Sequence, residues 1–355
     1  VGSVSGLVFQ DLNGNGQLDA GEPGQGNVTV IVTDSTGSTQ SLTTAGDGTW
    51  TANVPSGSAS FQVVVATFPV GAVLTTNNAT QGPITVLANQ TASSDPVGFQ
   101  LRGSLTGRVF LDGNGDGVED GTDTPLPGVT VIVTDCLGTT YSAVTNGSGV
   151  YTVASLPAGC NATVTVDPST LPPGAVNTTS NVPQTVPVTP GSTPTEPTPI
   201  GYAQYGDVTG RVFFDNNGDG TENGTDAGLA NVIISVLASD GTVTTASTDA
   251  SGVYTVPVIL AGQTTVTVVG SSLPTGSVLT TGNVPQNVTV VPGVATSATP
   301  IGYTQGGSVS GLVFQDLNGN GQLDAGEPGQ GNVTVIVTDS TGSTQSLTTA
   351  GDGTW

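Results

Sequence analysis

Hydrophobic and polar residues alternate over short stretches along the whole chain. Residues 27–33 have the sequence Asn-Val-Thr-Val-Ile-Val-Thr, and residues 129–134 and 232–237 repeat the pattern. A period of two residues with Val, Ile and Thr is typical of a β-strand that buries one face. We therefore expect strands at these places. No segment shows the 3.6-residue period of an amphipathic helix.

The alternating strand belongs to a series of short strands that recurs about every hundred residues, a length sufficient for one sandwich core. In the first copy the predicted strands are residues 4–9, 27–33, 49–54, 61–65, 84–87 and 97–99. A Gly-rich turn is expected between the strands at 27–33 and 49–54. Many short strands separated by Gly and Pro predict an all-β chain of tandem antiparallel Greek-key β-sandwiches, immunoglobulin-like or transthyretin-like.

The repeat also predicts the domain boundaries. Residues 1–102, 103–205 and 206–305 form three sandwich modules, joined by short connections, and residues 306–355 form the first half of a fourth. Residues 307–355 repeat residues 2–50 letter for letter, so a first strand is expected at 309–314. This half-module has no counterpart of residues 51–100 and is not expected to fold alone. Either the sequence is a window of a longer repetitive polypeptide, or another protomer completes the half-module by strand addition.

A loop rich in Asp, Asn and Gly follows the first strand of every module, at residues 11–22, 112–123, 215–226 and 316–327. Oxygen-bearing side chains stand at loop positions 1, 3, 5, 9 and 12, the carbonyl of position 7 is available, and position 6 is glycine. This is the ligand spacing of an EF-hand calcium loop, although the flanking strands exclude a true helix-loop-helix EF-hand. The alternative is a turn that uses Asx hydrogen bonds and binds nothing.

Four loops in one register favour the metal, and we expect about one Ca²⁺ per loop. Glu119 and Glu222, at position 8, are expected to point outward and are not counted as ligands. The predicted ligands are Asp11, Asn13, Asn15, Gln17, Asp19 and Glu22; Asp112, Asn114, Asp116, Val118, Asp120 and Asp123; Asp215, Asn217, Asp219, Thr221, Asn223 and Asp226; and Asp316, Asn318, Asn320, Gln322, Asp324 and Glu327.

Charge excludes several function classes. The chain has 26 acidic and 3 basic residues, a formal charge of -23, and no histidine. Such a chain offers no positive footprint for nucleic acid. More than half of the acidic residues lie in the four loops, where a cation would neutralise them. Without His or Lys, the chain cannot use His-ligated zinc, a His general base or a Lys nucleophile, so no enzyme is expected. No apolar run is long enough to insert into a membrane.

Cysteine and aromatic residues add two further expectations. Cys136 and Cys160 both lie in the second module, which predicts a disulfide and an extracellular setting, with two free thiols as the alternative. Trp50, Tyr151 and Tyr254 occupy one fixed strand position, which favours a core role over a carbohydrate platform. The aromatic residues that end the modules either fill the core or pack against the next module: Phe99, Tyr202 and Tyr303.

The run Val-Phe-x-Asp-x-Asn-Gly-Asn-Gly-x-x-Asp-x-Gly-Glu, followed by an alternating strand and Gly-x-Tyr/Trp, resembles the SdrD B-like repeat of bacterial surface adhesins. That repeat is a relative of the Cna B-type, transthyretin-like sandwich. The resemblance spans nearly the whole chain and implies calcium-binding sandwiches used in tandem as a stalk on the cell surface. The internal Lys–Asn isopeptide bond of some Cna B relatives cannot form here, because the chain has no lysine.

The function expected is therefore structural: a calcium-stabilised extracellular fibre or adhesin stalk, on a cell surface or in a secreted filament. Its partners would be neighbouring modules or protomers of the same fibre. The alternative is a calcium-dependent ligand-binding or glycan-binding module of an adhesin, which would also contact a host or matrix ligand. Near-equivalent modules favour the stalk over the binding module.

Overall fold

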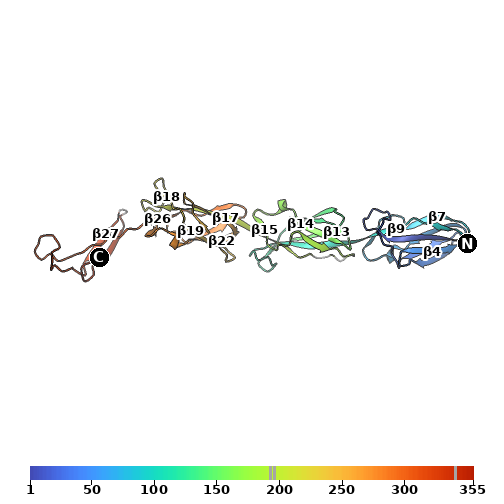
Figure 1. Cartoon of the computed structure of the whole chain (residues 1–355), viewed down its shortest axis with the longest axis horizontal. Helices are drawn as coiled ribbons and strands as arrows, with labels where there is room; N and C mark the ends of the chain where they lie inside the picture. Colours follow the sequence, from blue (N-terminus) through green and yellow to red (C-terminus); the bar gives the residue numbers. More distant parts are fainter. Residues whose placement is uncertain (192–193, 195–196, 340–341) are drawn as a thin grey trace. The chain divides into compact units, whose positions relative to one another are not determined.

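The computed structural model describes residues 1–191, 194, 197–339 and 342–355 (Figure 1). It divides into two compact units. The first contains residues 1–172 and 176–203, and the second contains residues 173–175 and 204–355. In the described part of the chain, no helix is long and apolar enough to cross a membrane.

The N-terminal module is a sandwich of two sheets. In the first sheet, β1 lies between β4, to which it is antiparallel, and β8 and β9, to which it is parallel. The second sheet has the antiparallel order β3-β2-β5-β7. The elements are β1 (Gly2–Gln10), β2 (Thr29–Thr33), β3 (Thr39–Thr43), β4 (Thr49–Val54), β5 (Gly57–Val63), the 3₁₀ turn η1 (Val65–Thr67), β6 (Ala72–Leu74), β7 (Thr80–Val86), β8 (Thr91–Ser93) and β9 (Val97–Leu111).

The core of this module comes from the alternation seen in the sequence. Val30 and Val32 of β2 point inward, and so does every second residue of β4 from Trp50 onward. Burial of a Val or Phe side chain stabilises a fold by about 1.5–3 kcal/mol. Trp50 is 4% exposed and its ring centroid lies 4.8 Å from that of Phe61. Trp50 is thus a core residue, as are its counterparts Tyr151 and Tyr254.

The next two modules repeat this arrangement, which confirms the all-β sandwich fold. Their second sheets have the orders β12-β11-β14-β16 and β20-β19-β22-β24. Their elements are β10 (Thr124–Pro125), β11 (Thr130–Thr134), β12 (Thr140–Val144), β13 (Val150–Pro157), β14 (Asn161–Val166), η2 (Pro168–Thr170), β15 (Ala175–Asn177), β16 (Gln184–Pro187), β17 (Ile200–Phe214), β18 (Ala227–Gly228), β19 (Ile233–Leu237), β20 (Val243–Ser247), β21 (Val253–Leu260), β22 (Gly262–Val268), η3 (Gly270–Ser272), β23 (Ser277–Leu279), β24 (Gln286–Val290), β25 (Ala295–Ser297) and β26 (Ile301–Gln305).

Three details differ from the sequence prediction. The expected Gly-rich turn contains an edge strand, β3, whose counterparts are β12 and β20. Four of the five β3 residues are exposed, so the strand has no hydrophobic alternation and is held by backbone pairing with β2. The sheets are not purely antiparallel, because β1 pairs in parallel with β8 and β9. The connections expected near residues 102 and 205 lie inside two long strands, β9 and β17.

The half-module forms a hairpin of β27 (Thr334–Thr338) and β28 (Thr344–Thr348). The strand expected at residues 309–314 was a wrong prediction. Among the described residues this segment makes only the isolated bridges Leu312↔Thr354 and Phe314↔Gly329. Its counterpart β1 is paired on both edges, whereas residues 307–355 hold no counterpart of β8 or β9 and only two residues of the β4 counterpart, Thr354 and Trp355. The core-facing Val335 and Val337 are accordingly only half-buried, whereas their counterparts Val30 and Val32 are buried.

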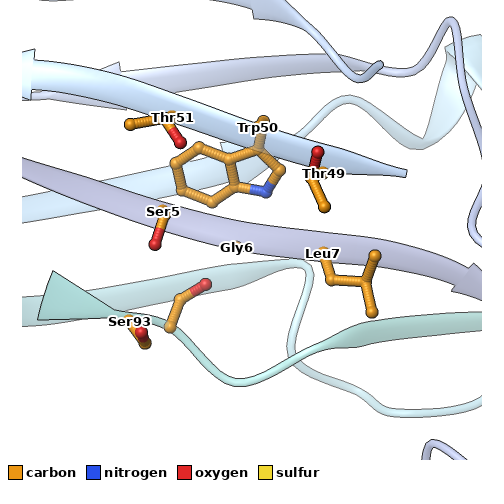
Figure 2. Close-up of a pocket in the computed structure, with 8 residues that line it drawn as sticks. Ser5, Gly6, Leu7, Thr49, Trp50, Thr51 and Ser93 are labelled. Carbon is orange, nitrogen blue, oxygen red and sulfur yellow. The ribbon is translucent and has the colours of Figure 1, made fainter. Parts of the chain in front are cut away.

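A close approach between β1 and β4 depends on Gly6. Figure 2 shows the Trp50 indole ring beside Gly6 of β1, in a shallow pocket that Ser5, Leu7 and Ser93 also line. A Cβ atom on Gly6 would lie 2.6 Å from Trp50 Cζ2 and 2.3 Å from the Ser94 hydroxyl oxygen. The ring can occupy this place only because the residue opposite it has no side chain.

We expect Gly6→Ala to destabilise module 1 by about 1–3 kcal/mol, since the added methyl group overpacks the contact with Trp50. Thermal unfolding followed by Trp50 fluorescence in a Trp355→Phe background measures this. Gly46→Ala is the control, because a Cβ there meets nothing within 4 Å. Equal melting of the two variants would contradict the packing role of Gly6.

Candidate metal-binding loops

Backbone hydrogen bonds place the beginning of each loop. Asp11 N donates to Phe99 O at 2.8 Å, and Gln10 N donates to Pro23 O at 2.9 Å. In the next two modules Asp112 N donates to Tyr202 O and Asp215 N to Tyr303 O, both at 2.9 Å. The residue that ends each module therefore anchors the first loop residue through its carbonyl. Its aromatic side chain is buried, which agrees with the core alternative for Phe99, Tyr202 and Tyr303.

The aspartate at position 1 organises the loop from within. Asp11 is 0% exposed, and its Oδ1 and Oδ2 accept hydrogen bonds from Gly14 N at 2.6 Å and Gly16 N at 2.7 Å. Both oxygens of Asp112, Asp215 and Asp316 accept the equivalent bonds. A buried carboxylate is costly unless N–H groups surround it, and charge-assisted bonds of this kind are strong. In Asp316 the bond from Gly321 N lowers the carboxyl pKa.

Glycine is required at position 6 for two reasons. Gly16 has a φ of 75°, and a Cβ on it would lie 3.1 Å from Thr75 O. The equivalent distance is 2.8 Å from Gly117 to Thr178 O. Loop 1 thus packs against the segment that follows β6, and loop 2 packs against the segment that follows β15. Each of these loops therefore contacts a later part of its own module as well as the first strand.

In loop 1 the side chains at positions 3, 5 and 9 converge. Asn13 Nδ2 and Asn15 Nδ2 both donate to Asp19 Oδ2, at 2.9 and 2.7 Å. These two bonds hold the pKa of Asp19 below its ordinary value of 3.8. Loop 4 repeats the arrangement, with Asn318 and Asn320 donating to Asp324 at 2.9 and 2.6 Å.

Loops 2 and 3 bring fewer of these groups together. Position 3 donates to position 5, from Asn114 to Asp116 at 2.9 Å and from Asn217 to Asp219 at 2.7 Å. Asp120, at position 9, instead accepts from Thr122 N and Oγ1, and Thr122 N lowers its pKa most. Asn223 Oδ1 accepts from Thr225 in the same way, and only a 3.5 Å contact joins Asn223 Nδ2 to Asp219 Oδ2.

Position 12 closes every loop by accepting two backbone N–H groups. Glu22 takes them from Leu12 and Asp19, at 2.8 and 2.9 Å. The counterparts Asp123, Asp226 and Glu327 accept the equivalent pairs. The backbone N–H at position 7 of each loop donates to the side-chain oxygen at position 5. The residues at position 7 are Gln17, Val118, Thr221 and Gln322. Each loop is therefore a closed series of hydrogen-bonded turns.

The donor set of the loops consists of oxygen atoms only, from carboxylates, amides and carbonyls, which suits a hard cation such as Ca²⁺. Within the described ranges, no three carboxylate, thiol or imidazole groups gather closely enough to hold a metal. Loop 1 instead mixes Asp19 with Asn13 and Asn15. Their amide nitrogens face the carboxylate and supply the partial positive charge that an ion would supply. In loops 1 and 4 the oxygen-bearing side chains at positions 3, 5 and 9 lie together, and their chemistry would suit calcium once the two amides turn their oxygens inward.

The sequence interpretation missed two ion pairs. Arg108 of β9 pairs with Glu119, with Nη1 and Oε1 2.7 Å apart, and Arg211 of β17 pairs with Glu222. The two glutamates thus tie position 8 of loops 2 and 3 to the first strand. A signal was present, because the equivalent positions in module 1 are Leu7 and Leu18, so both members of the pair change together. Exposed pairs of this kind are worth about 0–1 kcal/mol.

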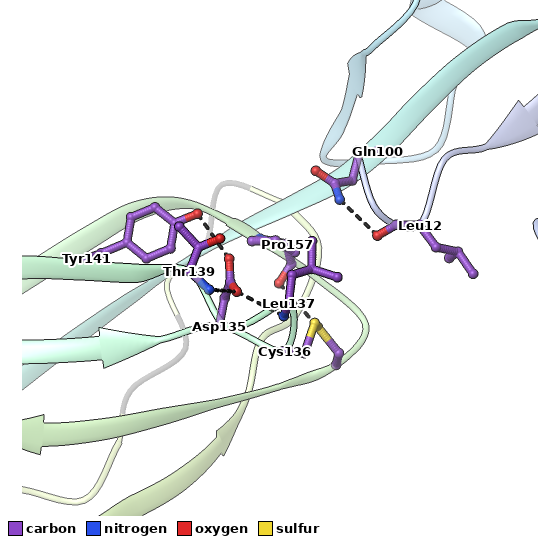
Figure 3. Close-up of a disulfide and its surroundings, with 9 residues drawn as sticks. Leu12, Gln100, Asp135, Cys136, Leu137, Thr139, Tyr141 and Pro157 are labelled. Atoms are coloured by element: carbon purple, nitrogen blue, oxygen red, sulfur yellow. Dashed lines mark hydrogen bonds between the residues drawn. A yellow bond between two sulfur atoms is a disulfide. The ribbon is translucent and has the colours of Figure 1, made fainter. Parts of the chain in front are cut away.

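Gln100 was also missed, and it ties loop 1 to β9 in another way. Its Nε2 donates to Leu12 O at 3.0 Å (Figure 3). The side chain is 3% exposed although the residue is polar. Module 2 has Ala203 at the equivalent position, so this contact is particular to the first module.

In module 2, Cys136 and Cys160 form a disulfide, with the two Cα atoms 6.0 Å apart. It links the turn after β11 to the start of β14 (Figure 3). Beside it, Asp135 is 6% exposed and accepts hydrogen bonds from Leu137 N, Thr139 N and the Tyr141 hydroxyl. Burial, and then the bond to Asp135, raise the pKa of Tyr141. A crosslink spanning 24 residues stabilises by about 3–4 kcal/mol on chain-entropy grounds.

Comparison with known proteins identifies the repeat. Residues 204–299 match the family model of the SdrD B-like domain. The chain is 26% identical to serine-aspartate repeat-containing protein D of Staphylococcus aureus strain Newman, over 95% of this chain and 28% of that protein. The strain MW2 protein has the same identity, over 27% of its length. The chain thus spans little more than a quarter of the length of these relatives. The resemblance to the SdrD B-like repeat is confirmed.

Two solved structures are similar at low identity. The Bacillus anthracis TIE protein has a TM-score of 0.36 and 17% identity, over 86% of this chain and 51% of that chain. BcpA, the major pilin subunit of Bacillus cereus, has a TM-score of 0.28 and 10% identity, over 86% of this chain and 99% of that chain.

We expect the double variant Asn13→Ala/Asn15→Ala to raise the pKa of Asp19 toward 3.8 in metal-free buffer, because both bonds that stabilise the carboxylate are lost. A lowered pKa in the folded state contributes stability above the unfolded value and loses it as pH falls through the folded value. The stability deficit of the variant should therefore be full near neutral pH and vanish in acid. Carboxyl NMR titration measures the pKa, and Asp34, whose pKa is lowered by Thr36, is the internal control.

Proposed function

We propose that this chain, in which residues 204–299 match the SdrD B-like domain family, is a structural segment of an extracellular fibre or adhesin stalk stabilised by calcium. Its modules would act as spacers on a cell surface or in a secreted filament, in contact with neighbouring modules or protomers. The observation that carries this proposal is the repetition of one loop at one place in consecutive sandwiches. Loops 1, 2 and 3 each connect the first strand, the last strand and the segment after β6, β15 or β23 of their own module.

Calcium would stabilise each module by offsetting the repulsion between the carboxylates of its loop. Asp11, Asp19 and Glu22 lie in one loop of twelve residues. Ion binding would draw their carboxylates together, and like charges about 4 Å apart repel by about 1–4 kcal/mol per pair, depending on the effective dielectric. A divalent cation converts this repulsion into attraction. At about millimolar calcium, a site with a dissociation constant of about 10 µM would stabilise its module by about 2.7 kcal/mol. That is a large share of the stability of a small domain.

The extracellular setting is supported by the Cys136–Cys160 disulfide, since such bonds persist in oxidising compartments. A glycan-binding or ligand-binding module is the weaker proposal. Trp50, Tyr151 and Tyr254 are between 1% and 4% exposed, so none offers an aromatic face to a sugar. The pocket of about 320 Å³ beside Trp50 is lined mainly by Ser and Thr hydroxyl groups and is open to solvent.

We expect exhaustive chelation to lower the melting temperature of the whole chain and re-addition of Ca²⁺ to restore it, because the ion binds only the folded loops. Asp19→Asn should reduce the calcium bound per chain by about one ion, since it removes a charged ligand with little change of size. Isothermal titration calorimetry and thermal melting measure the two effects.

Asp34→Asn is the matched control, because Asp34 caps the β2–β3 turn outside the loops. It should leave the stoichiometry unchanged. If chelation alters neither melting nor bound calcium, the loops are turns stabilised by Asx hydrogen bonds alone.

A further inference from the structure

The segment that connects modules 1 and 2 is fully paired β-structure. Leu101 of β9 pairs with Ala72 of β6, which belongs to module 1. The next residues, Arg102 and Gly103, pair with Pro157 and Leu156 of β13, which belongs to module 2. The strand thus exchanges one partner for the other between two consecutive residues. No residue of this connection is left as a free linker.

Backbone hydrogen bonds of Arg102 join both modules. Its N–H donates to Gly71 O at 2.7 Å, in the turn that precedes β6. Its carbonyl accepts from Gly191 N at 3.0 Å, in the segment that follows β16. The Arg102 side chain adds a third bond, from Nη1 to Ser155 O at 2.9 Å. One residue therefore carries hydrogen bonds to both of its neighbouring modules.

Gly71 and Gly191 touch at this point, and only glycine fits at residue 71. A Cβ on Gly71 would lie 2.5 Å from Gly191 N and 2.6 Å from Arg102 O, which are both backbone atoms that cannot rotate away. The φ of Gly71 is 84°, a conformation that side chains disfavour. The contact therefore depends on backbone meeting backbone with no side chain between.

The same contact occurs again within the second compact unit. Tyr205 N donates to Gly174 O, and Gly293 N donates to Tyr205 O, both at 2.8 Å. A Cβ on Gly174 would lie 2.5 Å from Gly293 N. In both places the first glycine ends a Pro-x-Gly sequence and the second follows a proline directly. Recurrence with different side chains at the central residue, Arg102 or Tyr205, indicates that the backbone arrangement is the conserved element of the joint within this chain.

The end of β13 supplies the extra residues that pair with Arg102 and Gly103 at the joint. β4 of module 1 ends at Val54, whereas β13 continues past the equivalent Ser155 to Pro157. Its register shifts between Val153 and Leu156, and Ser155 has a φ of 60°. This bulge turns the end of β13 back onto Arg102 and Gly103. β21 has the same feature, with Val258 at a φ of 57°.

We propose that the Gly71–Arg102–Gly191 contact is a lock that fixes module 2 on module 1, and that it holds whether or not the loops carry calcium. None of its atoms belongs to a loop residue, and its two backbone bonds, from Arg102 N to Gly71 O and from Gly191 N to Arg102 O, join uncharged groups. The inference goes beyond the proposed function, because it assigns the fixed geometry of this joint to two glycines instead of to the ion.

The test compares Gly71→Ala with Gly37→Ala in the full chain, each with calcium and with a chelator. Both glycines have a φ of 84°, but a Cβ on Gly37 meets nothing within 4 Å. The two variants therefore share the backbone strain, and only Gly71→Ala forces the joint apart. Hydrogen exchange at the Arg102 and Gly191 amides and the distance distribution between fluorophores on modules 1 and 2 are the readouts.

We expect exchange at both amides to rise by about tenfold or more in Gly71→Ala, with a broader distance distribution, while core amides such as that of Val131 stay protected. Gly37→Ala should match the parent chain in both readouts. If Gly71→Ala prevents module 1 from folding, Gly174→Ala replaces it, read at the Tyr205 and Gly293 amides. The proposal is overturned if the lock variants keep the parent protection, or if chelation alone loosens the joint to the same extent.

Discussion

Backbone hydrogen bonding along both edges of the first strand of each module holds the remaining features in place. β1 is paired with β4 on one edge and with β8 and then β9 on the other. That pairing brings Gly6 against Trp50, delivers Asp11 to the carbonyl of Phe99 and fixes where the loop begins. The half-module shows the reverse case. With only two residues of the β4 counterpart beside it and none of β8 or β9, the identical sequence makes only isolated bridges among the described residues, so sequence alone does not make this segment a strand.

Polar groups in the loops are arranged so that each carboxylate at positions 1 and 12 receives N–H donors. The acidic residues are therefore partly compensated by the chain itself, through backbone dipoles and Asn amides, before any ion is considered. In loops 1 and 4 two Asn amides donate to the carboxylate at position 9, whereas in loops 2 and 3 the amide at position 3 donates to the carboxylate at position 5. The ion pairs of Glu119 and Glu222 occur in these latter loops. The modules thus hold one loop shape by two different sets of side-chain contacts.

Most of the fold could be predicted from the sequence, because hydrophobic and polar residues alternate along the half-buried strands and the turns contain Gly, Pro and Asn. The strands at 27–33 and 49–54 were located to within two residues. β3 was missed because an exposed edge strand carries no hydrophobic period. The loop position of each oxygen-bearing side chain could be deduced from its spacing along the sequence. That spacing does not show which way an Asn amide is oriented, or from which neighbouring N–H group a carboxylate accepts a hydrogen bond. The Gly71–Gly191 contact was not foreseeable, since it joins turns far apart in the sequence.

The long strand β9 also determines how the protein would respond to tension. Its last three residues run parallel to the first three residues of β17, with Val109 opposite Ile200 and Leu111 opposite Tyr202. A stretching force enters module 2 along β9 and leaves along β17, so it draws two parallel neighbours in opposite directions. The hydrogen bonds between them are then loaded in shear, all at once, and none can be peeled open singly from an end. β1 with β9, and β17 with β26, have the same parallel relation, so each module would resist extension by the same geometry.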